Sequence, residues 1–261
     1  MTDVFRFQPG EQPLLISVPH DGREVPEDIR ARMSEAGLAV PDTDWYVAEL
    51  YEFAAELGAT MLIANFSRYV VDLNRSANDE ILYPGQAVTG LCPEQTFSGE
   101  NIYSSGGVDD AEKAARVEAY WRPYHARIRE TLDAMREQYG YALLWDAHSI
   151  PSCVPRLFEG ELPALNLGSN DTRSCARSIE AVVARVADAS PYSNVVNGRF
   201  RGGYITRHYG DPGNDIHALQ LEIAQRAYMN EKQGNFDEAK AARLRVTLSQ
   251  MLRNFLAAVK K

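Results

Sequence analysis

The chain has 261 residues, of which 45% are hydrophobic and 10% aromatic, so it can bury a substantial core and is not a disordered polypeptide. Its formal net charge of −9 opposes contact with phosphate backbones, which argues against a nucleic-acid partner. No apolar run is long enough to span a bilayer, and the first residues lack the order of a secretory signal, so we expect a cytoplasmic protein without a membrane partner.

Short apolar runs alternate with longer amphipathic stretches along the chain, which is typical of α/β proteins. The runs expected to form strands are 14–18, 59–64, 69–73, 141–146, 165–167, 194–196 and 217–223. Helices are expected over 42–57, 109–138, 172–189 and 237–259, with a kink or break at Pro123. The segment 74–107 is polar and shows little periodicity, and a loop of that length is more often functional than idle.

These elements predict a single domain over residues 1–261, built as a three-layer α/β/α sandwich with helices on both faces of a central mixed, mostly parallel sheet. Ligands of such folds bind at the carboxyl ends of the strands. His20 follows the strand at 14–18, and His148 follows the strand at 141–146. Neutral imidazole is the commonest metal ligand among side chains, so the two histidines form a candidate metal site.

A hydrolytic zinc usually takes three protein ligands and leaves one position for water, so a third group is needed. Asp44 is the preferred candidate because it lies where the chain returns from the first strand. Glu24, four residues after His20, is the alternative. Asp146 lies two residues before His148 and is better placed to orient that histidine than to bind the metal.

An acidic protein repels anionic ligands, so a small anionic substrate would need a local group of arginines. Arg68 and Arg75 flank the expected strand 69–73 and could pair with carboxylates through the guanidinium fork. Surface salt bridges are the alternative explanation for both. Arg207 and His208 lie between glycines in the segment 202–210 and could complete a substrate pocket.

Glu222 interrupts an otherwise apolar expected strand. Burial raises the pKa of a carboxyl group towards the range that suits a general base. A structural ion pair with an arginine or lysine is the alternative explanation for this residue. His125 and His217 are interpreted as ordinary core or surface histidines.

The segments that contain these residues make the chain resemble N-formylglutamate amidohydrolases, also called N-formylglutamate deformylases, over nearly its whole length. The matching segments are VPHDG (18–22), DTDWYV (42–47), SRYVVDLNR (67–75), YPGQAVTGLCP (83–93), WRPYH (121–125), LLWDAHS (143–149), NGRFRGGYITRHYG (197–210) and HALQLE (217–222). The family is similar, more distantly, to zinc carboxypeptidases and aspartoacylases. The resemblance implies their α/β/α fold, one zinc ion, and release of formate and glutamate during histidine degradation.

The resemblance also implies roles for single residues. His20 and His148 match the two ligand histidines, and Glu222 matches the glutamate that activates water. Arg68 looks like the arginine that polarises the scissile carbonyl. Carboxypeptidases carry a glutamate three residues after the first histidine, but position 23 here is Arg23, so Asp44 or Glu24 has to supply the middle ligand.

Substrate contacts follow from the same resemblance. Asn74 and Arg75 look like the Asn-Arg pair that holds a substrate carboxylate. A second carboxylate would be received by one of Arg199, Arg201 and Arg207.

Three other readings stay open at this point. The chain could be a zinc carboxypeptidase or a deacylase of another N-acyl amino acid, or a binding protein without turnover. A serine hydrolase acting through Ser149 is disfavoured, because the segment is not a GxSxG elbow. A site of two imidazoles and one carboxylate suits zinc, but the same ligands could hold manganese, cobalt or iron(II). The sequence carries no signal for an oligomeric state.

Overall fold

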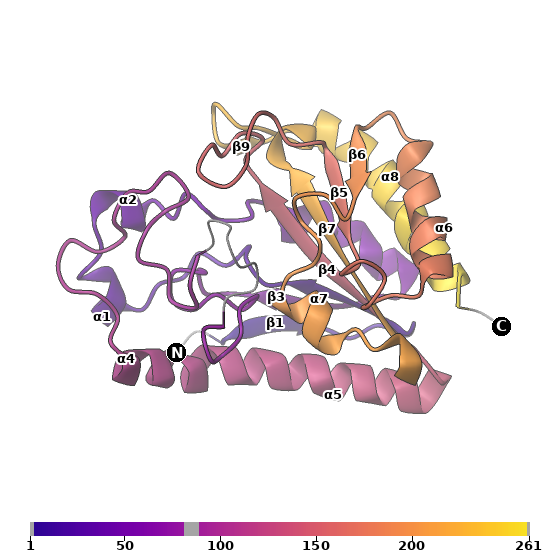
Figure 1. The fold of residues 1–261 in the computed structure, drawn as a ribbon, viewed down its shortest axis with the longest axis horizontal. Helices are drawn as coiled ribbons and strands as arrows, with labels where there is room; N and C mark the ends of the chain where they lie inside the picture. The colour runs from indigo at the N-terminus through magenta and orange to yellow at the C-terminus, as the bar shows by residue number, and fades with distance from the viewer. Residues whose placement is uncertain (1–2, 81–88, 260–261) are drawn as a thin grey trace.

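The computed structural model describes residues 3–80 and 89–259, in which helices cover both faces of a seven-stranded sheet (Figure 1). The strands, in the order in which they lie side by side, are β1 (Phe5–Gln8), β3 (Thr60–Ala64), β2 (Leu14–Val18), β4 (Ala142–Ile150), β7 (Ile216–Ala224), β5 (Leu165–Gly168) and β6 (Asn194–Val196). Strands β3, β2, β4 and β7 run parallel, whereas β1 pairs antiparallel with β3 and β5 antiparallel with β7. The expected three-layer fold with a mixed, mostly parallel sheet is confirmed.

The helices of the described residues are α1 (Glu27–Arg30), α2 (Glu35–Leu38), α3 (Val47–Leu50), α4 (Asp110–Arg116), α5 (Arg122–Tyr139), α6 (Arg177–Asp188), α7 (Tyr204–Tyr209) and α8 (Glu238–Ala257). Short 3₁₀ turns cover Glu52–Leu57, Pro212–Asn214 and Gln225–Ala227, and a small hairpin is formed by β8 (Met229–Asn230) and β9 (Asn235–Phe236). Within these described ranges, no helix combines the length and the apolar character that crossing a membrane requires.

The sheet separates two apolar layers because successive side chains of a strand point to opposite faces. Ile16 packs in the same cluster as Phe255 of α8, on the face that α6 and α8 cover. Its neighbour Leu15 packs in the other cluster with Ile128 of α5, which lies along the opposite face (Figure 1). Every residue of β2, β4 and β7 is buried, as expected for parallel strands covered on both faces.

The parallel strands β2, β4 and β7 end at the same edge of the sheet. Their register places Ser17 beside Asp146, and His148 beside Glu222. Because β5 runs antiparallel to β7, it begins at this edge, with Leu165 opposite Ile223.

The expected strand at 69–73 is wrong. The segment is buried but irregular, and its backbone groups are bonded to other parts of the chain. The guanidinium of Arg116 donates to the carbonyls of Tyr69 and Val70, and the Asp72 amide donates to the carbonyl of Leu91. A buried arginine thus satisfies backbone carbonyls that a neighbouring strand would bind in a sheet.

The expected helix at 42–57 starts later than its sequence indicates. The helix α3 begins at Val47, after Tyr46 in the left-handed conformation, and only a 3₁₀ turn follows it. Asp42 lies outside the helix, where its carboxylate accepts from the Tyr69 hydroxyl and the Phe97 amide. Asp44 is likewise held elsewhere, at the edge of the sheet.

The long helix expected at 109–138 is divided as predicted. A π turn over Val117–Trp121 separates α4 from α5 immediately before Pro123. Helix α6 begins at Arg177, five residues after the expected start at Thr172, because Thr172 has a positive φ of 66°. The expected loop 74–107 contains no helix or strand in its described parts, and residues 81–88, including most of YPGQAVTGLCP, lie outside the described residues.

Candidate active site

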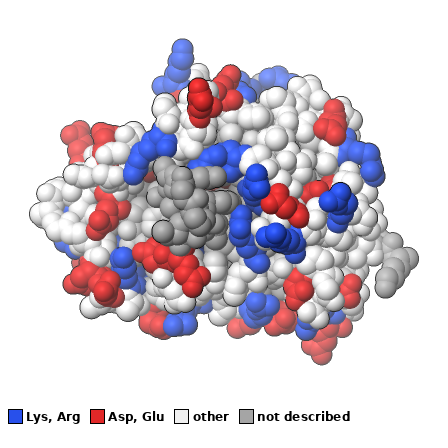
Figure 2. All heavy atoms as spheres, in the orientation of Figure 1, with Lys and Arg blue, Asp and Glu red and all other residues white. Residues whose placement is uncertain are grey.

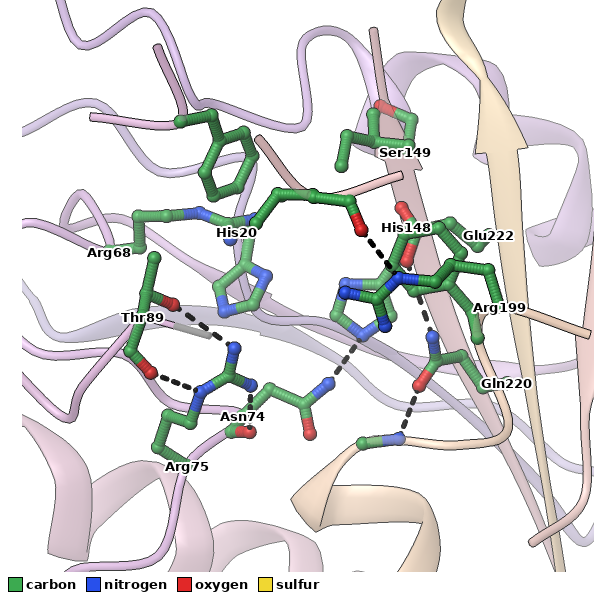
Figure 3. A pocket seen from close by; sticks show the side chains of 15 residues that line it. His20, Arg68, Asn74, Arg75, Thr89, His148, Ser149, Arg199, Gln220 and Glu222 are labelled. Carbon is green, nitrogen blue, oxygen red and sulfur yellow. Dashed lines mark hydrogen bonds between the residues drawn. The ribbon is translucent and has the colours of Figure 1, made fainter. Parts of the chain in front are cut away.

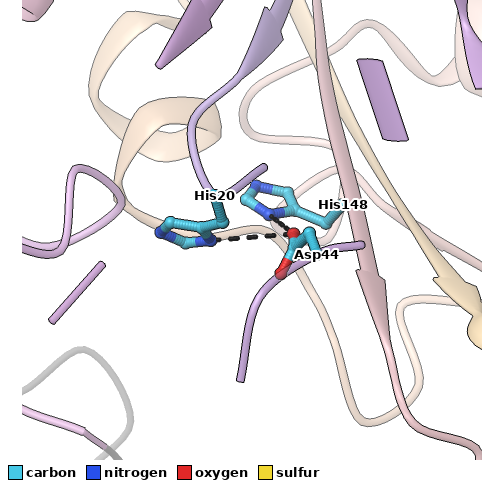
Figure 4. Close-up of side chains that lie close together, drawn as sticks. All are labelled: His20, Asp44 and His148. Atoms are coloured by element: carbon cyan, nitrogen blue, oxygen red, sulfur yellow. Dashed lines mark hydrogen bonds and ion pairs between the residues drawn. The ribbon is translucent and has the colours of Figure 1, made fainter. Parts of the chain in front are cut away.

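Three buried side chains converge at the carboxyl edge of the sheet (Figure 4). His20 follows β2, His148 lies near the end of β4, and Asp44 comes from the loop before α3. One ligand atom from each lies within 4.8 Å of the other two. Oδ2 of Asp44 is 3.0 Å from Nδ1 of His148 and 3.7 Å from Nδ1 of His20. Both imidazoles therefore present the same ring nitrogen to one carboxylate oxygen.

The far nitrogens of the two imidazoles each meet another buried carboxylate. Nε2 of His20 lies 2.8 Å from Oδ1 of Asp72, and Nε2 of His148 lies 3.1 Å from Oδ2 of Asp146. A histidine that binds a metal usually donates its other N–H to such a group, which fixes the ring and its tautomer. Here the pairs hold both rings with their Nδ1 atoms turned towards Asp44.

This group fits a divalent cation. Nδ1 of His20 is buried and has no hydrogen-bond partner among the described residues. Burial alone would raise the pKa of Asp44, but Arg68 and the two histidines hold the pKa of this carboxyl well below its usual range. Burial lowers the pKa of His148, but Asp146 and Asp44 outweigh it and raise the pKa well above its usual value. The local field therefore favours positive charge where the ligand atoms meet.

Glu24, the alternative middle ligand, lies elsewhere. Its side chain is exposed, and its backbone bridges to Phe66. Asp44 is instead oriented by Arg68, whose Nη2 donates to Oδ1 over 2.5 Å, and by the Ser149 amide, which donates to Oδ2 over 3.1 Å. One oxygen of Asp44 is thus fixed by the guanidinium, and the other is turned towards the histidines.

Glu222 projects into the same site from β7, in register with His148 (Figure 3). Its Oε2 accepts a hydrogen bond from Nε2 of Gln220, and Oε1 of Gln220 accepts from the Gly203 amide over 2.6 Å. Burial raises the pKa of Glu222 above its usual value. No arginine or lysine in the described part of the chain forms a salt bridge with it, so the structural ion pair considered from the sequence is absent there.

A cavity opens onto these groups. The residues that line it are His20, Arg68, Asn74, Arg75, Thr89, Phe97, His148, Ser149, Ile150, Leu157, Arg199, Phe200, Gly203, Gln220 and Glu222. Arginines thus project into the cavity although the chain as a whole is acidic, and basic side chains gather near the middle of the face shown in Figure 2.

The sequence-predicted binding residues separate into two groups. Asn74 and Arg75 lie on the cavity wall, where Arg75 is held by the carbonyl and hydroxyl of Thr89 (Figure 3). Arg207 and His208 lie on α7 and are not among the described residues that line the cavity. Arg207 donates to the carbonyl of Gly202, and the ring of His208 stacks on Tyr204.

Of the three arginines considered for a second carboxylate, Arg199 lines the cavity. Its Nε donates to the Leu157 carbonyl over 2.8 Å (Figure 3). Arg201 is exposed and pairs with Asp171. Ser149, the alternative nucleophile, has its hydroxyl bonded to Tyr228 and Gln225 rather than to an imidazole.

Sequence reasoning missed Asp72 and Gln220. Asp72 was missed because the expected strand at 69–73 would have placed this residue in the sheet. In the structure it lies beside His20. Gln220 could have been found, because residues two apart on a strand share a face and Gln220 precedes Glu222 by two.

Asn74 links the site to α7. Its Oδ1 accepts from the Ile205 amide, and its Nδ2 lies 3.3 Å from Oδ2 of Asp146. A Cβ atom at Gly203 would lie 2.2 Å from Nδ2 of Asn74, so a larger residue there would have to displace the Asn74 amide. The start of α7 therefore fixes a side chain that touches His148.

Two relatives cover nearly the whole chain. An N-formylglutamate deformylase of Pseudomonas putida is 47% identical over 260 residues, which are 98% of this chain and 97% of the relative. An N-formylglutamate deformylase of Pseudomonas aeruginosa is 47% identical over 259 residues, which are 97% of each.

Solved structures show the same fold. The N-formylglutamate amidohydrolase of Ralstonia eutropha JMP134 superposes with a TM-score of 0.82 at 24% identity, covering 96% of each chain. A protein from Agrobacterium tumefaciens superposes with a TM-score of 0.73 at 19% identity, over 97% of this chain and 96% of the other. The family model of N-formylglutamate amidohydrolases matches residues 12–229, and it spans all the residues that line the cavity. The chain therefore belongs to the N-formylglutamate amidohydrolase family.

Proposed function

We propose that this chain hydrolyses N-formyl-L-glutamate to L-glutamate and formate with the help of one divalent metal ion, zinc being the first choice, and that it serves histidine degradation. The convergence of His20, Asp44 and His148 beside Glu222 carries this proposal. The names of the relatives from the two Pseudomonas species support the substrate.

A divalent cation held by His20, Asp44 and His148 would supply a Lewis acid that polarises the formyl carbonyl and lowers the pKa of a nearby water. In this proposal Asp72 and Asp146 accept the protons of the two imidazoles, so that the nitrogens facing Asp44 would bind the cation.

Glu222 is the proposed general base and general acid. Its carboxylate accepts a proton from the water that attacks the formyl carbon, and then delivers that proton to the amide nitrogen. The carbon–nitrogen bond breaks as the nitrogen becomes an amine, so formate and glutamate leave. Burial, which raises the pKa of Glu222, and the hydrogen bond from Gln220 suit this residue to the role.

The arginines of the cavity are assigned to the negative charges of the substrate and transition state. Arg68 lies beside the ligand atoms and, in this proposal, stabilises the developing oxyanion. Asn74 and Arg75 adjoin each other on the wall and receive the α-carboxylate in this proposal. The side-chain carboxylate is assigned to Arg199, in preference to Arg207 and His208, because Arg199 lines the cavity.

Metal analysis combined with an activity assay tests the proposal. The purified chain should contain about one equivalent of a divalent metal and release formate from N-formyl-L-glutamate. Treatment with a chelator should abolish release, and adding zinc should restore it. Activity that survives complete metal removal would refute metal dependence.

The remaining alternatives give different results in the same assay. A carboxypeptidase or a deacylase of another N-acyl amino acid would release glutamate from an N-acetyl or peptide substrate and no formate. A binding protein without turnover would hold N-formylglutamate and release nothing.

A further inference from the structure

A thin wall separates the active-site cavity from a second, apolar hollow on the surface. The second hollow is lined by Pro41, Asp42, Phe97, Ser98, Pro151, Cys153, Val154, Pro155 and Arg156. In two segments of this wall, one residue lines the cavity and the residue next to it in sequence lines the hollow. Ile150 faces the cavity and Pro151 the hollow, and Leu157 faces the cavity and Arg156 the hollow.

Phe97 is the one residue in the described part of the chain that lines both spaces. Its ring packs with Ile150 and Val154, and only 8% of the residue is exposed. The guanidinium carbon of Arg68 lies 5.1 Å from the centre of this ring.

This contact places the ring where the acyl group of a substrate would lie. If Arg68 stabilises the carbonyl oxygen, the substituent on the carbonyl carbon has to lie within a few ångströms of the same guanidinium. Phe97 is an apolar side chain that lies at this distance from the guanidinium. A formyl group carries only hydrogen at this position, whereas acetyl and longer groups carry carbon that would meet the ring.

We propose that Phe97 sets the acyl-size limit of the enzyme by closing the cavity against the neighbouring hollow, an inference that rests on the function proposed above. The cavity has a volume of about 80 Å³, and the hollow behind the ring has about 430 Å³. Removal of the ring would join the two spaces and give a larger acyl group room to extend.

The backbone at this position is held independently of the ring. The Phe97 amide donates to Oδ2 of Asp42, which also accepts from the Tyr69 hydroxyl. Arg156 donates to the carbonyl of Thr96 and to the side chain of Gln95. A smaller residue at 97 should therefore open the wall and leave the segment in place.

The test compares wild type, Phe97→Leu, Phe97→Ala and Val154→Ala. Val154→Ala is the matched control because it enlarges the hollow and leaves the ring of Phe97. Glutamate release is measured with N-formyl-, N-acetyl-, N-propionyl- and N-butyryl-L-glutamate, and folding is checked by circular dichroism. The ratio of kcat/KM for butyryl to formyl substrate should rise at least about tenfold in Phe97→Ala, with Phe97→Leu in between.

The outcomes distinguish this inference from the proposed function. The inference is overturned if the butyryl-to-formyl ratio is unchanged in folded Phe97→Leu and Phe97→Ala, or if it rises equally in Val154→Ala. In either case formate release by wild type still upholds the proposed function. Wild type without formate release overturns both. If Phe97→Ala does not fold, the ratio in Phe97→Leu decides.

Discussion

Each histidine of the site has one nitrogen turned to a carboxylate outside the ligand group and one turned to Asp44. This arrangement orients both rings and turns their Nδ1 atoms towards one point, where a cation could be held. Burial and the nearby carboxylates of Asp44 and Asp146 raise the pKa of Glu222, whereas His148 and Arg68 oppose this rise.

Glu222→Gln removes the proton acceptor and retains the shape of the side chain. We expect kcat for formate release to fall by on the order of a hundredfold or more, because general-base catalysis is lost. Metal content should stay at the wild-type level, because Glu222 is outside the ligand group. A variant that keeps wild-type kcat would contradict the role assigned to Glu222, and elemental analysis checks the metal.

Arg199→Met removes the charge assigned to the side-chain carboxylate. We expect the preference for N-formylglutamate over N-formylglutamine, measured as the ratio of kcat/KM, to fall by roughly tenfold to a hundredfold, as for a lost hydrogen bond to a charged group. Arg201→Met is the matched control, because Arg201 is exposed and pairs with Asp171. The assignment fails if the two variants change the ratio equally.

At the scale of elements, helix α5 carries a histidine that anchors the segment leading to the site. The ring of His125 stacks on Trp121, its Nδ1 lies 2.9 Å from the Tyr209 hydroxyl, and its Nε2 donates to the Leu73 carbonyl over 2.8 Å. Burial lowers the pKa of His125 to about 3. The ring is therefore neutral in the folded chain, as expected for the core histidine read from the sequence.

This histidine should make stability depend on pH. The unfolded chain binds the proton below a pKa of about 6.5 and the folded chain does not, so stability present above that pH is lost as the pH falls towards 3. Between pH 7 and pH 5 the loss is about 2 kcal/mol. In urea unfolding with a chelator present, His125→Gln should show a decline smaller by about that amount. Equal declines in the variant and wild type would contradict the prediction.

Elements with a clear period could be predicted from the sequence, and those set by distant side chains could not. The strands at Leu14–Val18, Thr60–Ala64 and Ile216–Ala224 follow from apolar runs. The apolar run at 69–73 is no strand, because Arg116, 43 positions beyond Leu73, binds its carbonyls. The short edge strand β1 was missed, since only its alternate residues are half-buried.

The site was predictable to the extent that it lies at strand ends. His20, His148 and Glu222 lie on or just after strands whose direction places them at one edge. The wall of the cavity depends on loops such as the one containing Phe97, whose course no local pattern indicates. Arg207 and His208 lie on α7 and are not among the described lining residues, so their role in substrate binding stays a prediction.

At the scale of the whole molecule, the ligand group joins parts of the chain that are far apart in sequence. Asp44 and His148 are separated by 104 positions. A cation bound by this group should therefore stabilise the fold, by about 2.7 kcal/mol when its concentration is a hundred times the Kd.

Thermal denaturation followed by circular dichroism checks this stabilisation. Chelation should lower the Tm of wild type, and return of the metal should restore it. His148→Ala should show a lower Tm that no longer responds to the chelator. A wild-type Tm that is the same with and without its metal would contradict the prediction.

The antiparallel direction of β5 leaves room for sequence changes at the entrance of the cavity in enzymes of this fold. Because β4 leaves the sheet at the active edge and β5 enters at the same edge, residues 151–164 have to fold back over that edge. They bring Leu157 to the cavity without belonging to any strand. Insertions or deletions there could reshape the entrance for new substrates while every strand pairing, and with it the hydrolytic apparatus, stays as it is.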